Sequence, residues 1–81
     1  MINVCREISW FVKDGDDCVG DVNVDNIPLE FLIEIFNPAE DDPLLILVYT
    51  IDPDKSKRLA EWVDVDFDYK KYQYFLYCWQ A

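Results

Sequence analysis

Hydrophobic and polar positions first alternate along this chain, as they do in a β-strand. From Val4 to Lys13 the apolar side chains of Ile8 and Trp10 lie on one side, and a mixed set lies on the other. The alternation returns from Cys18 to Val24, after the acidic and glycine-containing stretch 14–17. We therefore predict a β-hairpin with its turn at these four residues.

The register of the hairpin follows from which side chains must share a face. A two-residue loop at positions 15 and 16 would set Trp10 opposite Asp21, whereas a three-residue loop at 15–17 sets Trp10 opposite Val22. A slip of one residue moves the apolar set of a strand to the wrong face. We therefore expect the three-residue loop.

The spacing becomes helical after the hairpin. Asp25 and Asn26 offer capping side chains, Pro28 suits a first helical turn, and Asn37-Pro38 is expected to end the helix. The apolar positions with helical spacing are Leu29, Leu32, Ile33 and Phe36. Because Phe31 and Ile35 widen the apolar arc, we expect this helix to be well buried.

A second strand–helix pair follows an acidic loop with a proline at each end, residues 38–43. The run from Leu44 to Ile51 is apolar and rich in β-branched residues, which predicts a fully buried strand. Asp52 is then placed to cap a second helix, with Pro53 at its first position. Leu59, Trp62 and Val63 are expected to face inward from this helix.

The last stretch, Asp64 to Ala81, combines aspartates at alternate positions with a dense aromatic run. In a strand alternate positions share a face, so Asp64, Asp66 and Asp68 would form one charged row. The aromatic run is too rich for one face, which favours a central or self-covering strand that ends in an acidic lip. Its aromatic residues are Tyr69, Tyr72, Tyr74, Phe75, Tyr77 and Trp79.

The elements in order are strand, strand, helix, strand, helix and strand. This order predicts one α+β domain over residues 1–81, with a mixed or mainly antiparallel sheet of four strands and both helices packed on one face. We expect the chain's own tyrosines and tryptophans to cover the other face in part, with a partner as an alternative cover.

Charge narrows the classes of partner. Seventeen acidic residues against seven basic ones give a formal net charge of −10, and the chain has no histidine. Such a surface repels nucleic acid and anionic membranes and attracts basic proteins at long range, although acidity also serves solubility alone. The start of the chain lacks a basic and apolar leader pattern, and no apolar run reaches the roughly 18 residues that span a bilayer. We expect a cytoplasmic protein.

The residue types argue against an enzyme. Without histidine, serine–histidine, cysteine–histidine and histidine–metal arrangements are excluded. Cys5, Cys18 and Cys78 are an odd number without CxxC spacing, and we interpret them as reduced. Asp64 to Asp68 copies the start of a calcium loop, but Tyr69 stands where glycine is needed, so we reject an EF-hand. We predict no cofactor and no metal site; a divalent-ion site on the carboxylates is the alternative.

Rows of carboxylates have a further use, because they can present charge to the lysines and arginines that grip phosphate in a nuclease. Tyrosines beside such a row are anchors of the kind that interfaces favour. The hairpin tip, residues 14–17, adds a further acidic group. The alternative for each group is a solvated loop or edge. The candidate partner-binding residues are Asp64, Asp66, Asp68, Tyr69, Tyr72, Glu40, Asp41 and Asp42.

Several segments also resemble a known family. They are residues 6–11 (REISWF), 42–44 (DPL), 67–69 (FDY) and 72–76 (YQYFL). They are similar to a small family of short acidic bacterial domains of unknown function, of a type that resembles the immunity proteins of contact-dependent inhibition and related polymorphic toxin systems. The resemblance implies that the protein binds and blocks a cognate toxin domain, often a nuclease. The other hypothesis is a non-enzymatic structural domain that self-associates into a homodimer.

Overall fold

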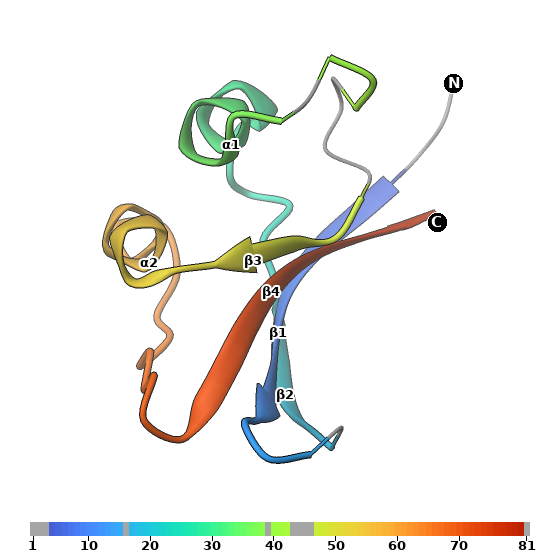
Figure 1. Cartoon of the computed structure of the whole chain (residues 1–81). Coiled ribbons are helices and arrows are strands. Elements are labelled where there is room, and N and C mark those ends of the chain that lie inside the picture. Colours follow the sequence, from blue (N-terminus) through green and yellow to red (C-terminus); the bar gives the residue numbers. More distant parts are fainter. Residues whose placement is uncertain (1–3, 16, 39, 43–46, 81) are drawn as a thin grey trace.

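The computed structural model describes residues 4–15, 17–38, 40–42 and 47–80. Within them the order β-β-α-β-α-β confirms the predicted α+β class, and the sheet is antiparallel throughout, with strand order β2-β1-β4-β3. Both helices lie on one side of this sheet (Figure 1). The elements are β1 (Val4–Val12), β2 (Cys18–Asn23), α1 (Leu29–Phe36), β3 (Tyr49–Ile51), α2 (Pro53–Leu59) and β4 (Tyr72–Gln80).

The hairpin is present, but its predicted register is wrong by two residues. Ile8 pairs with Val22 and Trp10 pairs with Gly20, and a bulge shifts the pairing after Trp10. A shift of two residues keeps each side chain on its face, so the apolar residues still point to one side. The physical reason lies at Gly20, where a Cβ atom would lie 2.5 Å from the Trp10 ring. The indole needs a residue without a side chain opposite it.

The first helix ends as predicted but begins differently. Asn37 adopts the left-handed conformation with φ 46° and closes α1. Pro28 stands at the N-cap, and no side chain caps the helix. Asp25 instead accepts hydrogen bonds from the Arg6 backbone N–H at 2.8 Å and from the side chain of Asn23. These bonds hold the pKa of Asp25 below its usual range and tie the end of β2 to β1.

The second helix begins as predicted. The Asp52 carboxylate accepts a hydrogen bond from the Lys55 backbone N–H at 2.8 Å, and Pro53 opens the helix. The strand before it differs from the expectation, because β3 has only three residues at the edge of the sheet. Leu47 and Val48 lie outside it and are exposed. Residues 44–46 of the predicted strand lie outside the described residues.

The final strand is central, which is the first of the two predicted alternatives, because β4 pairs with β1 on one side and with β3 on the other. The aspartates that precede it are not part of this strand. Residues 63–68 form an extended loop, and a turn at 69–71 leads into β4. The expected charged row is therefore carried by a loop beside the sheet.

The core fills the space between the helices and one face of the sheet. Alternation sends the even-numbered side chains of β1 and β4, such as Ile8 and Leu76, into this layer, and both are fully buried. The odd-numbered side chains point to the opposite face. The buried apolar residues are Ile8, Val24, Ile27, Leu32, Ile35, Phe36, Ile51, Leu59, Tyr74 and Leu76.

Candidate functional site

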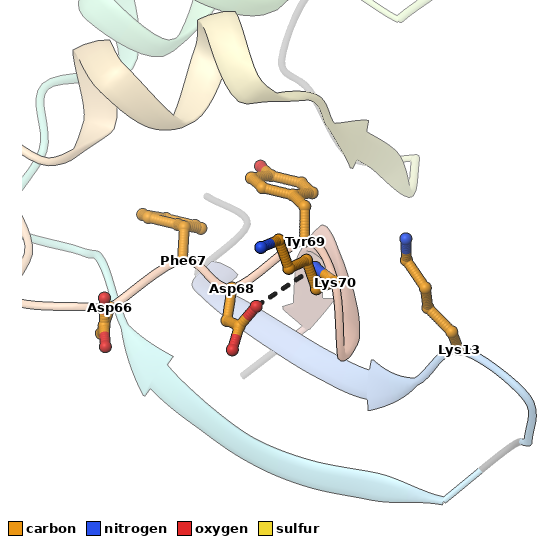
Figure 2. Close-up of a pocket in the computed structure, with 6 residues that line it drawn as sticks. All are labelled: Lys13, Asp66, Phe67, Asp68, Tyr69 and Lys70. Atoms are coloured by element: carbon orange, nitrogen blue, oxygen red, sulfur yellow. Dashed lines mark hydrogen bonds between the residues drawn. The ribbon is translucent and has the colours of Figure 1, made fainter.

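The predicted aspartate row lies on the extended loop 63–68. Alternation persists without strand pairing, because Val65 and Phe67 pack against the core while Asp64 and Asp66 are exposed. Figure 2 shows Asp66 and Asp68 pointing to one side of the loop and Phe67 to the other. Val65 and Phe67 therefore fix the loop to the core, and the carboxylates of Asp64 and Asp66 remain in solvent.

Two tyrosine hydroxyls anchor this loop. The Tyr74 hydroxyl accepts a hydrogen bond from the Asp68 backbone N–H at 2.7 Å and donates one to the Asp66 carbonyl at 3.2 Å. The Tyr69 hydroxyl donates to the Ile51 carbonyl on β3 at 2.8 Å. Burial raises the pKa of both phenols above the ordinary tyrosine value, so both hydroxyls keep their protons to a higher pH than a free tyrosine does. Tyr69 is thus a structural anchor, and its hydroxyl is already used within the chain.

An open depression of about 610 Å³ lies beside the row. It is lined by Asp66 and Asp68 and also by Lys13 and Lys70, so its charge is mixed. Lys13 comes from the end of β1, and its backbone N–H donates to the Lys71 carbonyl at 3.2 Å, which joins the hairpin tip to this loop. The lysines offset part of the acidic charge that the sequence predicted here.

The structure does not bring the second predicted acidic group to the first. Segment 40–42 lies at the opposite end of the molecule from loop 63–71 (Figure 1). Glu40 and Asp41 are exposed, but Asp42 is only 1% exposed and differs from the expectation of a surface carboxylate. Asp42 accepts hydrogen bonds from the Tyr49 hydroxyl and the Leu47 backbone N–H. The first of these raises the pKa of Tyr49 to about 12.

Tyr72, the last of the predicted site residues, lies on the core side of the sheet. It is half-buried, and its ring meets that of Tyr74 edge to face with the centroids 6.4 Å apart. Of the eight predicted residues, Asp64, Asp66, Glu40 and Asp41 are therefore fully available at the surface. They belong to two separate places.

A further surface lies on the face of the sheet away from the helices. We call it the open face and define it by Phe11 on β1 and by Phe75, Tyr77 and Trp79 on β4. The Phe11 ring centroid is 5.8 Å from that of Phe75 and 6.3 Å from that of Tyr77, and Tyr77 is 5.8 Å from Trp79. In the described residues neither helix covers this face (Figure 1). Trp79 is 54% exposed.

The open face was absent from the predicted site residues, although the sequence carries a signal for it. The odd-numbered positions of the last strand are aromatic from Phe75 to Trp79, and Phe11 shares their side. A sheet with helices on one face only must leave such residues uncovered unless something else packs there. The sequence therefore indicated this surface in two ways. The last strand has aromatic residues on both of its sides, and the two predicted helices cover only one side of the sheet.

The described residues show neither a metal-binding cluster nor a membrane-spanning helix. No group of three or more histidine, cysteine, aspartate or glutamate side chains there is placed to hold a metal ion. None of the helices in the described ranges is long and apolar enough to cross a membrane.

The fold and its surfaces define a small antiparallel α+β domain, in which the described helices leave one face of the sheet uncovered. Residues 5–77 match the family model described as Domain of unknown function (DUF7683), and the chain belongs to this family. No curated protein and no solved structure matches the chain.

Proposed function

We propose that this protein is an immunity protein that binds a cognate bacterial toxin domain, a nuclease in our hypothesis, and blocks it by occlusion in the cytoplasm. It acts through binding and not through catalysis. The partner has a basic surface, because a chain with net charge −10 associates fastest with a cation-rich protein.

One observation carries the proposal above the others. Asp64 and Asp66 stand exposed on a loop whose backbone is anchored by the buried Tyr74 hydroxyl. Carboxylates on an anchored backbone lose little conformational freedom when they meet lysines or arginines. The arrangement suits a ligand for a phosphate-binding cleft, whose cations it would occupy in place of nucleic acid.

The test is a pull-down with the product of the gene immediately upstream, followed by calorimetry on the purified pair. We expect a one-to-one complex of about nanomolar affinity or tighter. The double variant Asp64→Lys with Asp66→Lys should weaken it. The control for the same change of total charge is the double variant Asp54→Lys with Glu61→Lys, at two exposed positions on the helix side. Absence of any complex with the upstream product would contradict the proposal.

Salt dependence tests whether charge steers the association of the two proteins. The association rate of the complex should fall as salt concentration rises, because exposed charges are screened over about 10 Å at 0.1 M ionic strength. The dissociation rate should change less. An association rate that does not depend on salt would remove steering from the mechanism and leave occlusion alone.

A second function is favoured by the open face. A structural domain that self-associates would bury Phe11, Phe75, Tyr77 and Trp79 against a second copy, as uncovered aromatic faces often do. Sedimentation at several protein concentrations separates the two functions. A monomer at every concentration would exclude the self-associating domain.

A further inference from the structure

We propose that the open face is the main contact for a cationic protein partner, and that it receives an arginine side chain against Tyr77, Trp79 and Glu7. This inference rests on the proposed function and deepens it. It places the main contact on the sheet and keeps the aspartate row on loop 63–68 as a second contact with cations of the partner.

The aromatic rings form one continuous surface. Phe11 contacts both Phe75 and Tyr77, and Tyr77 lies nearly parallel to Trp79, with an interplanar angle of 12°. Ser9, between the rings on the same side of β1, is only 5% exposed. Clustered aromatic side chains on a rigid sheet are the kind of anchor that dominates binding energy at interfaces.

The open face is also hollowed. A shallow depression of about 230 Å³ lies at the hairpin end of the ring cluster. It offers a place for a side chain of the partner beside the rings, so the surface is more than a flat apolar patch. Its lining residues are Phe11, Gly15, Gln73, Phe75 and Tyr77.

The charges beside the rings select the partner. Strand pairing places Glu7 and Asp21 on the same side as Phe75 and Tyr77, because Glu7 pairs with Tyr77 and Ser9 lies between Asp21 and Phe75. These are the charged side chains that the strands in the described ranges direct to this side. A cation is attracted here by two interactions, the cation–π interaction with the faces of the rings and the charge of the neighbouring carboxylates.

Glu7 and Trp79 together fit a guanidinium group. The Trp79 Nε1–H donates a hydrogen bond to the Glu7 carboxylate, which holds the carboxylate beside the rings. A carboxylate has about four acceptor positions, so one bond from an indole leaves capacity for a bidentate pair. Arginine matches this geometry better than lysine because its planar group stacks on a ring while it donates two parallel bonds.

The same charges argue against a second copy of this chain as the occupant. A two-fold contact through the open face would place carboxylates of one copy near those of the other, because Glu7 and Asp21 border the rings in both. Each copy also carries a net charge of −10. Opposite charges across an interface favour association, and like charges oppose it.

The test compares variants of the open face with matched variants on the helix side, using calorimetry with the upstream partner. Trp79→Ser and Glu7→Gln are the test variants. Trp62→Ser is the control for an exposed tryptophan, because Trp62 is 37% exposed beside Phe31, and Glu61→Gln is the control for an exposed glutamate. We expect Trp79→Ser to weaken binding by about tenfold or more and the controls to change it by less than about twofold.

The outcomes separate this inference from the proposed function. If the partner binds one to one but only Asp64→Lys with Asp66→Lys or Trp62→Ser weakens the complex, the proposed function stands and the inference is overturned. If the protein forms a dimer that Trp79→Ser abolishes, the occupant is a second copy and the inference is overturned as well.

If no upstream product binds, the proposed function fails and the open face is tested with peptides. Nona-arginine is titrated into the ¹⁵N-labelled protein, with nona-lysine as the control of equal charge. We expect the indole N–H signal of Trp79 to shift more with nona-arginine, and that of Trp62 to stay in place. Equal shifts with both peptides, or a shift at Trp62 instead, would overturn the inference.

Discussion

The buried Tyr74 hydroxyl accepts a hydrogen bond from the Asp68 backbone N–H at 2.7 Å, so a core residue of β4 holds the loop that presents the exposed aspartates. The same hydroxyl donates to the Asp66 carbonyl. One side chain therefore couples the core to the acidic surface, and a substitution of Tyr74 in the core should alter the loop that carries the aspartates.

Tyr74→Phe should lower the free energy of unfolding by about 1–3 kcal/mol, because the ring is kept while the Asp68 N–H and the Asp66 carbonyl lose a partner. Urea unfolding measures this change, and Tyr72→Phe, on the same side of the same strand, is the control with a smaller expected effect. Hydrogen exchange at the Asp68 amide should become faster. An unchanged exchange rate there would contradict the proposed anchoring.

Gly20→Ala should destabilise the hairpin by about 1–3 kcal/mol, because the added Cβ would lie 2.5 Å from the rigid Trp10 ring. Gly15→Ala is the matched control. There the nearest atom is a methyl group of Val12 at 3.2 Å, and a smaller effect is expected.

The clash at Gly20 also predicts a specific rescue. Trp10→Leu in the Gly20→Ala background should recover part of the lost stability, because the smaller side chain leaves room for the new methyl group. Additive losses in the double variant would show that contact with the indole is not the reason for glycine here.

Stability should fall at alkaline pH because of Tyr49. Its hydrogen bond to Asp42 raises the pKa of Tyr49 to about 12, from 10.0 for a free tyrosine. The folded chain therefore binds this proton more tightly than the unfolded chain does. The contribution of protonated Tyr49 to the free energy of unfolding is complete below about pH 10 and is lost as the pH rises toward about 12.

The role of Tyr49 at alkaline pH is tested by measuring the midpoint of urea unfolding as a function of pH in the wild type and in Tyr49→Phe. The variant should be less stable at neutral pH, because the buried Asp42 carboxylate loses a donor, and should lose less further stability above pH 10. Tyr69 and Tyr74, whose pKa values are also raised, keep some alkaline dependence in both proteins. Parallel pH profiles would contradict the role assigned to Tyr49.

Millimolar calcium, magnesium or manganese should leave the melting temperature unchanged. Asp68 already accepts a hydrogen bond from the Lys70 backbone N–H at 3.1 Å, and the ammonium groups of Lys13 and Lys70 share the depression with the carboxylates. These cations compete with a divalent ion. An increase in the melting temperature that Asp66→Asn removes would instead favour an ion-dependent protein.

The order of elements and most of their ends were determined by the sequence alone. The start of α2 at Asp52-Pro53 and the end of α1 at Asn37 could be predicted because capping groups act on their own neighbours in the chain. Alternation also predicted that Asp64 and Asp66 share one charged row, and both are exposed, although they lie on a loop and not on the predicted strand. Such features depend on contacts within a few residues.

Only the tertiary structure decided the register, the length of β3 and the availability of the candidate site residues. The register depends on Trp10 meeting Gly20 across two strands, and the burial of Asp42 depends on Tyr49 lying beside it. The order of elements already predicted both helices on one side of the sheet, but the aromatic side chains that line the other side follow from how β1 and β4 pair. These are contacts between elements, and a pattern along one segment does not specify which other segment covers it.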